Sequence, residues 1–329
     1  MKQVWRILVA VLAIAALAAG GTVAYGQRGA STAPAKRAAA RTFTFEPAPK
    51  ANPEGIVFDK RRQRFLVSDT GDGKIYGGTL GNTAMTPFIP AQGAAAVGLE
   101  IRRNKLYVAG GPSGEIRVYD LRTRRQVAKF DTGSGGFLND VAVTGSGDVF
   151  VTDSFRPTLW HVTPAQVRAG SGTVQPLATP PAAIGFKADP SGQTFNLNGI
   201  VARTGHQLVV VNTNTGRLFR IDLNQRRNAI RRIARIRGAT VPTGDGMILD
   251  GGRLVVVQGG NAAQNVPTQI SFVKLRRGAT RAQVQRTQRS RRLVGPSTIT
   301  RARNRYLVVN ANFSAPNVAP NVVALPRGR

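Results

Sequence analysis

Four oxygen-bearing side chains occupy the same position in four similar segments of the sequence. Glu54, Asn139, Asn198 and Asp245 each stand at the start of a short apolar run. Two carboxylates and two amide carbonyls supply hard oxygen ligands and two negative charges, a set that suits calcium, with another hard divalent cation as the alternative. Zinc is disfavoured because neither His nor Cys occupies these positions. Each residue alone is compatible with a turn, but the shared register favours a metal site.

The segment that carries these side chains recurs along the chain. Its copies share one register at Glu54, Val97, Asn139, Asn198, Asp245 and Pro296, with steps of 43, 42, 59, 47 and 51 residues. A period of roughly 40 to 50 residues with three or four strands per unit is typical of β-propellers, whose blades cannot bury their faces alone. We therefore predict an all-β, six-bladed propeller of four-stranded antiparallel blades, with the registered residues at its central channel.

The composition agrees with many short strands in one large domain. The chain has 329 residues, is 42% hydrophobic, and contains 37 Gly and 19 Pro, which is sufficient for a large core joined by tight turns. The absence of Cys excludes disulfides, thiolate metal sites and a cysteine nucleophile. With only His161 and His206 available, a Ser/His/Asp triad is not expected.

The first 26 residues have the pattern of a secretory signal peptide. Two basic residues, Lys2 and Arg6, precede an apolar run from Ile7 to Ala19, and small residues follow up to Gly26. This order predicts export, cleavage near Gly26 and a secreted protein. An uncleaved membrane anchor is the alternative, because residues 7–24 are at the lower edge of the length that spans a bilayer.

A linker and one isolated strand are expected before the first copy of the repeat. Residues 27–42 are rich in Ala, Pro and Arg and predict a linker, followed by the propeller at residues 43–329. Phe43 and Phe45 alternate with polar neighbours, as in a half-buried strand. We predict that this strand joins the last blade and closes the ring, because closure removes two exposed sheet edges.

The chain is strongly basic. It has 46 Lys plus Arg against 16 Asp plus Glu, a formal net charge of +30, and only 6% aromatic residues. Such a surface attracts polyanions, but it has little aromatic material for stacking bases, so no specific nucleic acid is expected. We interpret the charge first as a solvated surface and second as a surface that adheres to anionic cell-envelope polymers. A monomer is expected.

Four short motifs resemble the signature sites of a known family. PEGI at 53–56, LND at 138–140, LNG at 197–199 and GDGM at 244–247 are similar to those of the SMP-30/gluconolactonase/LRE-like family. The resemblance, which covers Pro53 to about Phe313, implies a six-bladed, calcium-dependent propeller that hydrolyses lactones or related esters. It implies that Glu54, Asn198 and Asp245 bind the metal and that Asn139 borders metal and substrate. It also places the general base at Asp245, so Asp245 and Asn139 are the expected catalytic residues.

The substrate pocket departs from the sugar lactonases of that family. Where those members carry an Arg two residues before the Asn of the third-blade motif, this chain has Phe137. A long insertion before Asn198 brings Phe195 near the same mouth, and we predict that it forms a lid or substrate wall. These two apolar side chains favour a hydrophobic ester or lactone over a small sugar lactone.

Three functional hypotheses follow. The first is a secreted calcium-dependent hydrolase of lactones or related esters. The second is a non-catalytic basic propeller that binds anionic envelope polymers and holds a structural channel metal. The third, a carbon-carbon bond-forming relative of the strictosidine synthase type, is the weakest, because that branch relies on a late Glu and no acid occurs after Asp250.

Overall fold

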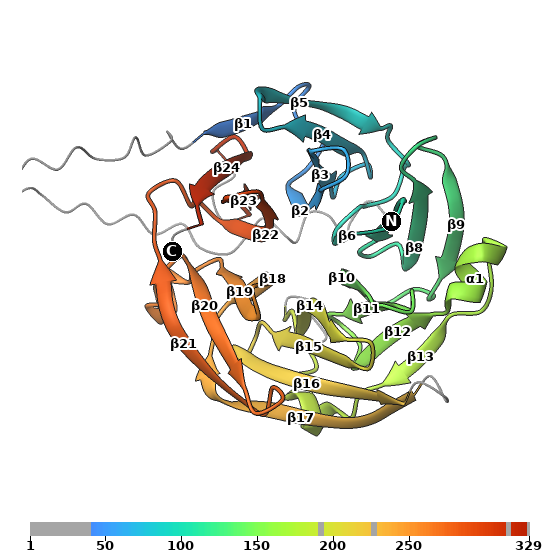
Figure 1. The fold of residues 1–329 in the computed structure, drawn as a ribbon, viewed down its shortest axis with the longest axis vertical. Coiled ribbons are helices and arrows are strands. Elements are labelled where there is room, and N and C mark those ends of the chain that lie inside the picture. Colours follow the sequence, from blue (N-terminus) through green and yellow to red (C-terminus); the bar gives the residue numbers. More distant parts are fainter. Residues whose placement is uncertain (1–40, 190–193, 225–228, 314–316, 328–329) are drawn as a thin grey trace, which may run out of the picture.

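The strands of this protein are arranged in a ring around a central axis (Figure 1). The computed structural model describes residues 41–189, 194–224, 229–313 and 317–327. In these residues, strands account for nearly all of the regular structure, so the all-β prediction is confirmed. The predicted signal peptide at residues 1–26 and most of the linker at 27–42 lie outside the described residues.

The elements follow one another in five sets of four strands and a last set of three, which β1 completes. The bounds are β1 Thr42–Phe45; β2 Pro53–Asp59, β3 Arg64–Asp69, β4 Ile75–Thr79 and β5 Asn82–Ile89; β6 Leu99–Arg102, β7 Lys105–Ala109, β8 Glu115–Asp120 and β9 Gln126–Asp131; β10 Leu138–Val143, β11 Val149–Asp153, β12 Thr158–Val162 and β13 Gln175–Ala178. They continue with β14 Leu197–Thr204, β15 Gln207–Asn212, β16 Arg217–Asn224 and β17 Ala229–Thr240; β18 Gly244–Asp250, β19 Arg253–Gln258, β20 Gln269–Arg276 and β21 Arg281–Gln288; β22 Pro296–Ala302, β23 Arg305–Asn310 and β24 Asn321–Pro326. Among the described residues, three short helices lie in the connections: α1 Pro164–Ala169, α2 Pro181–Ile184 and the 3₁₀ helix η2 Ala262–Gln264.

Hydrogen bonding groups these strands into four sheets, where the sequence predicted six separate blades. Strands β6 to β9 and β10 to β13 form two four-stranded sheets, and the others form two eight-stranded sheets. Each eight-stranded sheet contains two runs of four strands, which meet where outer strands pair in parallel, β1 with β5 and β17 with β21. The predicted four-stranded antiparallel blades are therefore seen only in part, because at these two junctions neighbouring outer strands come close enough to share hydrogen bonds.

The apolar side chains are buried between neighbouring four-stranded units. Strands such as β15, whose residues Gln207–Asn212 are all buried, carry consecutive Val and Leu residues because both of their faces are covered. Six clusters of buried apolar residues fill the spaces between consecutive units, including one between the last unit and the first. Each unit thus depends on both neighbours to remove its apolar surface from water.

The first strand of each unit lines the centre of the ring. Strands β2, β6, β10, β14, β18 and β22 contact one another in that order, and β22 contacts β2 (Figure 1). Their starts lie at one level: the amide of Gly98 donates to the carbonyl of Asn139 at 2.8 Å, and the hydroxyl of Ser297 donates to the carbonyl of Glu54 at 2.9 Å. A Cβ on Gly199 would collide with the carbonyl oxygen of Asp245, so this close approach requires glycine.

The N-terminal strand closes the ring, as predicted. Thr42 and Phe43 of β1 pair antiparallel with β24, while Thr44 and Phe45 pair in parallel with β5. Phe43 is fully buried and packs edge-on against Phe65, with ring centroids 4.9 Å apart. The chain is thereby joined to itself where its last unit meets its first.

Removing this closure is expected to destabilise the whole ring. Deleting residues 41–47 should lower the melting temperature by several degrees, and Phe43→Ala should lower the free energy of unfolding by about 3 to 5 kcal/mol, because it empties a buried aromatic site. Thr44→Ala is the matched control, since Thr44 is exposed on the same strand. Chemical denaturation of the three variants measures the effect, and an unchanged stability of Phe43→Ala would contradict the closure role.

Within the described residues, no helix has the length and apolar character needed to span a membrane.

Candidate functional site

The structure places the four predicted site residues at the starts of four central strands. Glu54 lies on β2, Asn139 on β10, Asn198 on β14 and Asp245 on β18. Glu54, Asn139 and Asn198 are buried and Asp245 is half-buried. Burial raises the pKa of Glu54, and repulsion from Asp245, which is far from Glu54 in the sequence, raises it further. Each of the four is the second residue of its strand, so all four stand at the same end of the central strands.

Hydrogen bonds hold one side of the Asn139 amide and leave the other side free. The Nδ2 group of Asn139 donates to the hydroxyl of Ser154 at 3.0 Å, and that hydroxyl donates to the carbonyl of Leu197 at 2.7 Å. Ser154 thus links strand β10 to the neighbouring strand β14. The Oδ1 atom of Asn139 is buried and accepts no hydrogen bond in the described part of the chain. This arrangement presents a carbonyl oxygen, not an amide proton donor, to the site.

The other three side chains follow the same principle. The hydroxyl of Thr298 donates to Oε1 of Glu54 at 3.3 Å, and Oε2 is left without a partner. The side chain of Asn198 interacts with the carboxylate of Asp245, whereas Oδ1 of Asn198 and Oδ1 of Asp245 are buried and unpaired. Each of the four residues therefore keeps one buried oxygen that no described group satisfies. Buried polar atoms are normally hydrogen-bonded, so four such oxygens on four registered residues indicate a missing partner.

The missing partner is expected to be positively charged. In the described part of the chain, no Lys or Arg forms an ion pair with Glu54 or Asp245. Nor do the described residues contain a cluster of three or more His, Cys, Asp or Glu side chains arranged to hold a metal ion. The donor set instead combines two carboxylates with two amide carbonyls, and such mixed oxygen sets fit a hard divalent cation.

The electrostatics of the channel also favour a cation. Burial, repulsion from Asp245 and repulsion from Asp140 raise the pKa of Glu54 well above its usual range. Burial raises the pKa of Asp245 to about 7, against the lowering effects of Asn198 and the Gly246 amide. A buried carboxylate without a counter-charge takes up protons readily, and a bound cation would replace those protons.

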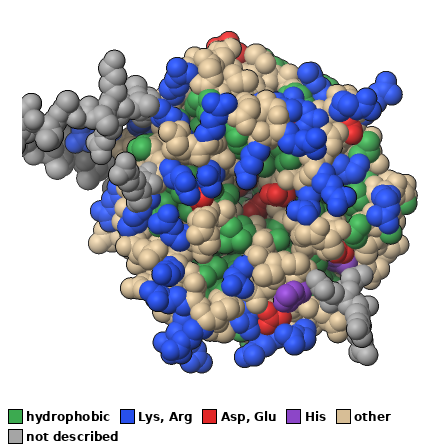
Figure 2. Space-filling view, viewed as in Figure 1, with side chains coloured by type: hydrophobic (Ala, Val, Ile, Leu, Met, Phe, Trp, Pro, Cys, Tyr) green, Lys and Arg blue, Asp and Glu red, His purple; other side chains and the backbone are tan. Residues whose placement is uncertain are grey.

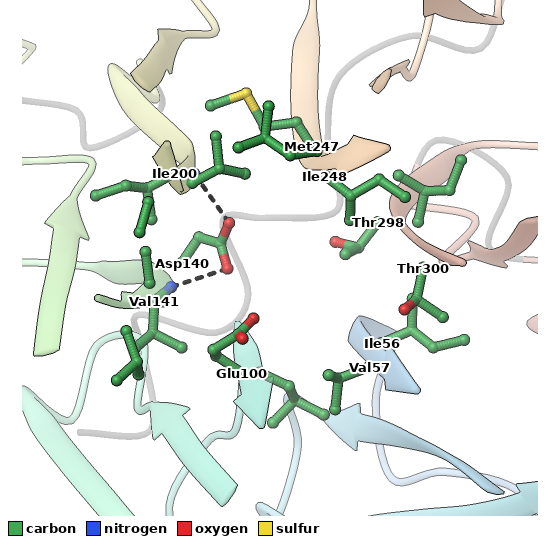
Figure 3. Close-up of a pocket in the computed structure, with 17 residues that line it drawn as sticks. Ile56, Val57, Glu100, Asp140, Val141, Ile200, Met247, Ile248, Thr298 and Thr300 are labelled. Atoms are coloured by element: carbon green, nitrogen blue, oxygen red, sulfur yellow. Dashed lines mark hydrogen bonds between the residues drawn. The ribbon is translucent and has the colours of Figure 1, made fainter. Parts of the chain in front are cut away.

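A cavity of about 230 Å³ lies in the central channel, lined by all six first strands. Figure 3 shows the carboxylates of Asp140 and Glu100 directed into this cavity, with Thr298 and Thr300 on another side of it. The backbone amides of Val141 and Ile200 donate to Asp140 at 2.8 and 3.0 Å. Burial raises the pKa of Asp140 to about 7, and burial together with repulsion from Asp140 raises that of Glu100 to about 8.

Asp140 and Glu100 are functional candidates that the sequence analysis missed, although the repeat register contains a signal for both. One position after the registered residue, the other five copies carry Gly or Ser where this copy has Asp140. Three positions after it, the other five copies are apolar where the second copy has Glu100. A charged residue at a repeat position that is small or apolar in the other copies therefore marks the channel.

Three half-buried phenylalanines form a cluster beside the site. The rings of Phe137 and Phe195, both predicted to border the substrate, have centroids 5.1 Å apart. Phe155, which the sequence analysis did not single out, completes the cluster at 5.4 Å from Phe137 and 5.1 Å from Phe195. Phe155 follows Ser154, the residue that holds Asn139. Because Phe155 and Ser154 are adjacent in the chain, the cluster lies next to a residue that holds a candidate ligand.

Both histidines lie on the side of the ring where the first strand of each unit ends. His161 is fully buried on β12, stacks on Phe150 at 4.8 Å and bonds Asp148 through Nε2 at 3.0 Å. His206 is exposed in the turn between β14 and β15. Neither lies among the residues that line the central cavity.

Comparisons with known proteins identify the fold. No family model and no curated sequence matches the chain. Among solved structures, a calcium-binding protein, regucalcin, from Agrobacterium tumefaciens matches at 17% identity with a TM-score of 0.61, covering 85% of this chain and 92% of that one. A luciferin-regenerating enzyme matches at 13% identity with a TM-score of 0.59, covering 85% of this chain and 92% of that one. A gluconolactonase from Xanthomonas campestris matches at 14% identity with a TM-score of 0.57, covering 85% of this chain and 88% of that one. The chain shares the fold of these three proteins.

Proposed function

We propose that this chain is a metal-dependent hydrolase of lactones or related esters, with calcium as the metal. The observation that carries the proposal is the set of four unpaired, buried oxygens on Glu54, Asn139, Asn198 and Asp245. Support also comes from the fold shared with a gluconolactonase and with a calcium-binding protein. We infer further that the six four-stranded units are the blades of a six-bladed propeller of the SMP-30/gluconolactonase/LRE-like type.

Each residue of the site would have a defined role. Glu54, Asn139, Asn198 and Asp245 would hold the cation through their free oxygens. The cation would supply Lewis-acid polarisation of a lactone or ester carbonyl. Ser154 and Thr298 would fix the Asn139 and Glu54 side chains, and such supporting hydrogen bonds keep ligands in a single orientation.

Asp245 would act on the attacking water. Its carboxylate lies beside Asn198, and Oδ1, the oxygen that would also face the cation, has a second lone pair with which to accept a hydrogen bond from the attacking water. A carboxylate next to a cation has a lowered pKa and is a weaker base, so the main contribution of Asp245 would be to orient the water. Orientation of a nucleophile within reach of the carbonyl removes a large part of the entropic barrier.

The phenylalanine cluster would bind the non-reacting part of the substrate. Phe137, Phe155 and Phe195 offer a half-buried aromatic wall. Burial of alkyl groups against such a wall stabilises binding by roughly 0.8 kcal/mol per methylene. We therefore propose that the substrates are lactones or esters with hydrophobic substituents.

A panel of lactones with graded alkyl chains tests this proposal. Activity should rise with chain length, disappear on chelation and return with calcium. Phe137→Arg should lower kcat/KM for the longer lactones by about tenfold or more and leave small lactones less affected. The matched control is Val127→Arg, because Val127 is an exposed apolar residue on an outer strand.

The panel also separates this proposal from the alternative. A non-catalytic propeller with a structural channel metal would be stabilised by calcium and would hydrolyse no lactone or ester. Secretion remains part of the proposal and rests on the sequence of residues 1–26; detection of the cleaved chain in culture medium tests it.

A further inference from the structure

An arginine-rich seam joins two outer strands of one eight-stranded sheet. We define the β17–β21 seam as the exposed residues Arg231, Arg235 and Arg237 of β17, Arg277 in the turn before β21, and Arg281 of β21. Strands β17 and β21 contain no Asp or Glu, and the chain has no acid at all after Asp250. The positive charge of the seam is therefore not balanced along its own strands.

The pairing of the two strands places like charges opposite each other. Arg237 and Arg281 are direct partners in the parallel pairing of β17 and β21, and the amide of Arg237 donates to the carbonyl of Thr280 at 3.1 Å. In the described part of the chain neither side chain forms an ion pair, in contrast to Arg220 on the adjacent strand, which pairs with Asp222 at 2.9 Å. Like charges directly opposite on neighbouring strands are destabilising. An anion bound between them would remove the repulsion.

The chemistry of the seam favours phosphate groups along a chain. Of the basic residues in this protein, 37 are Arg and 9 are Lys, and the arginine fork matches a phosphate group with two parallel hydrogen bonds. The seam arginines of strand β17 run from Arg231 to Arg237, so they extend over roughly 20 Å at the usual rise per residue. A long, narrow row of arginines fits several phosphates of one polymer better than a single small anion.

The surroundings argue against a bilayer and against bases. The exposed large hydrophobic residues of the described chain are Val127, Phe313 and Val318, and none belongs to the seam, so it offers no apolar anchor for a membrane. It also has no aromatic residue on which bases could stack. Recognition at the seam therefore depends on charge and on the spacing of the arginines.

We propose that the β17–β21 seam is a docking surface for a flexible, linear polymer of phosphate groups. The seam lies at the outer rim of the ring, whereas the candidate site lies at its centre (Figure 1). Basic side chains also spread over the face shown in Figure 2, where they surround a central hollow with acidic side chains at its base. The basic side chains of that face attract anions without fixing their positions, whereas the seam adds an ordered row of arginines. The inference goes beyond the proposed hydrolase function and does not depend on it.

Two triple variants with the same change of charge test the proposal. The seam variant is Arg235→Gln, Arg237→Gln and Arg281→Gln; the control is Arg61→Gln, Arg122→Gln and Arg125→Gln, three exposed arginines in turns away from the seam. Fluorescence anisotropy with labelled inorganic polyphosphate measures affinity at several salt concentrations. The seam variant should bind at least tenfold more weakly, with a salt slope reduced by about one for each arginine removed. The control variant should stay within about twofold of the unaltered protein, and thermal melts verify that both variants fold.

Three results would overturn the proposal. Equal losses in the two variants would mean that net charge alone attracts the polymer. Tighter binding to duplex DNA than to polyphosphate of equal charge would point to a stiff partner. Binding to phosphatidylglycerol vesicles that depends on the seam, without binding to polyphosphate, would assign the surface to a membrane.

Discussion

Asp245→Asn is expected to abolish lactone hydrolysis, lowering kcat by about 10³-fold at saturating calcium. The substitution keeps the size of the side chain but replaces a carboxylate oxygen by an amide group. Of the four residues with unpaired buried oxygens, Glu54 and Asp245 are the two acids, and Asp245 is the more exposed of them. It is therefore the acid that water and substrate can approach. Steady-state kinetics on a hydrophobic lactone measures the loss.

A second readout distinguishes a chemical role from a structural one. Burial raises the pKa of Asp245 to about 7, so its ionisation is disfavoured in the folded chain without metal. Asp245→Asn should therefore leave the chelated protein at least as stable as the unaltered protein at pH 8. Asp131→Asn is the matched control, because Asp131 is exposed at the end of β9 and should change neither activity nor stability. Turnover of Asp245→Asn above a tenth of the normal value would remove this residue from the mechanism.

The ring of similar units was predictable because each unit repeats the same local sequence pattern. An oxygen-bearing residue followed by an apolar run recurs in four of the six first strands, and a register error of one residue would turn the side chains of each run to the opposite face. The alternation of Phe43 and Phe45 identified the closing strand for the same reason. The parallel pairing of β1 with β5 and of β17 with β21 was not predictable, since outer strands have the same alternation whether or not they meet a neighbour.

The candidate ligands were predictable in position but not in their surroundings. Glu54 and Asn198 stand at registered positions, whereas the hydroxyl groups that orient the site come from second strands or from neighbouring units, as with Ser154 and Thr298. Such partners are chosen by tertiary packing, and Ser and Thr are too common in turns to be identified from one sequence. Phe155 was missed because its contact with Phe137 depends on how two connections fold over the same mouth.

Stability of the chelated protein is expected to fall as the pH rises from about 5 to about 8. Burial raises the pKa of Asp140 and Asp245 to about 7 and that of Glu100 to about 8, and it also raises that of Glu54. Unfolded Asp and Glu have pKa values near 4, so the folded chain binds more protons than the unfolded chain over this interval. Stability then decreases as the pH rises through the folded pKa values.

Calcium should reverse this dependence. A cation held by Glu54 and Asp245 competes with the protons of these groups, so its affinity should increase as the pH rises and the carboxylates ionise. The stabilisation by calcium grows with the ratio of free metal to its dissociation constant. The difference in melting temperature between the calcium-loaded and the chelated protein should therefore be larger at pH 8 than at pH 5. Differential scanning calorimetry at both pH values, with calcium or with chelator, measures it.

Glu100→Gln provides the control that separates the two effects. Glu100 points into the cavity but is not one of the candidate ligands (Figure 3). Its replacement should flatten part of the pH dependence of the chelated protein, while the calcium-induced shift at pH 8 is retained. Glu54→Gln, by contrast, should reduce that shift strongly, because it removes one of two charged ligands. A chelated protein whose melting temperature is constant between pH 5 and pH 8 would show that these carboxyls titrate normally, and the electrostatic argument for a channel cation would then fail.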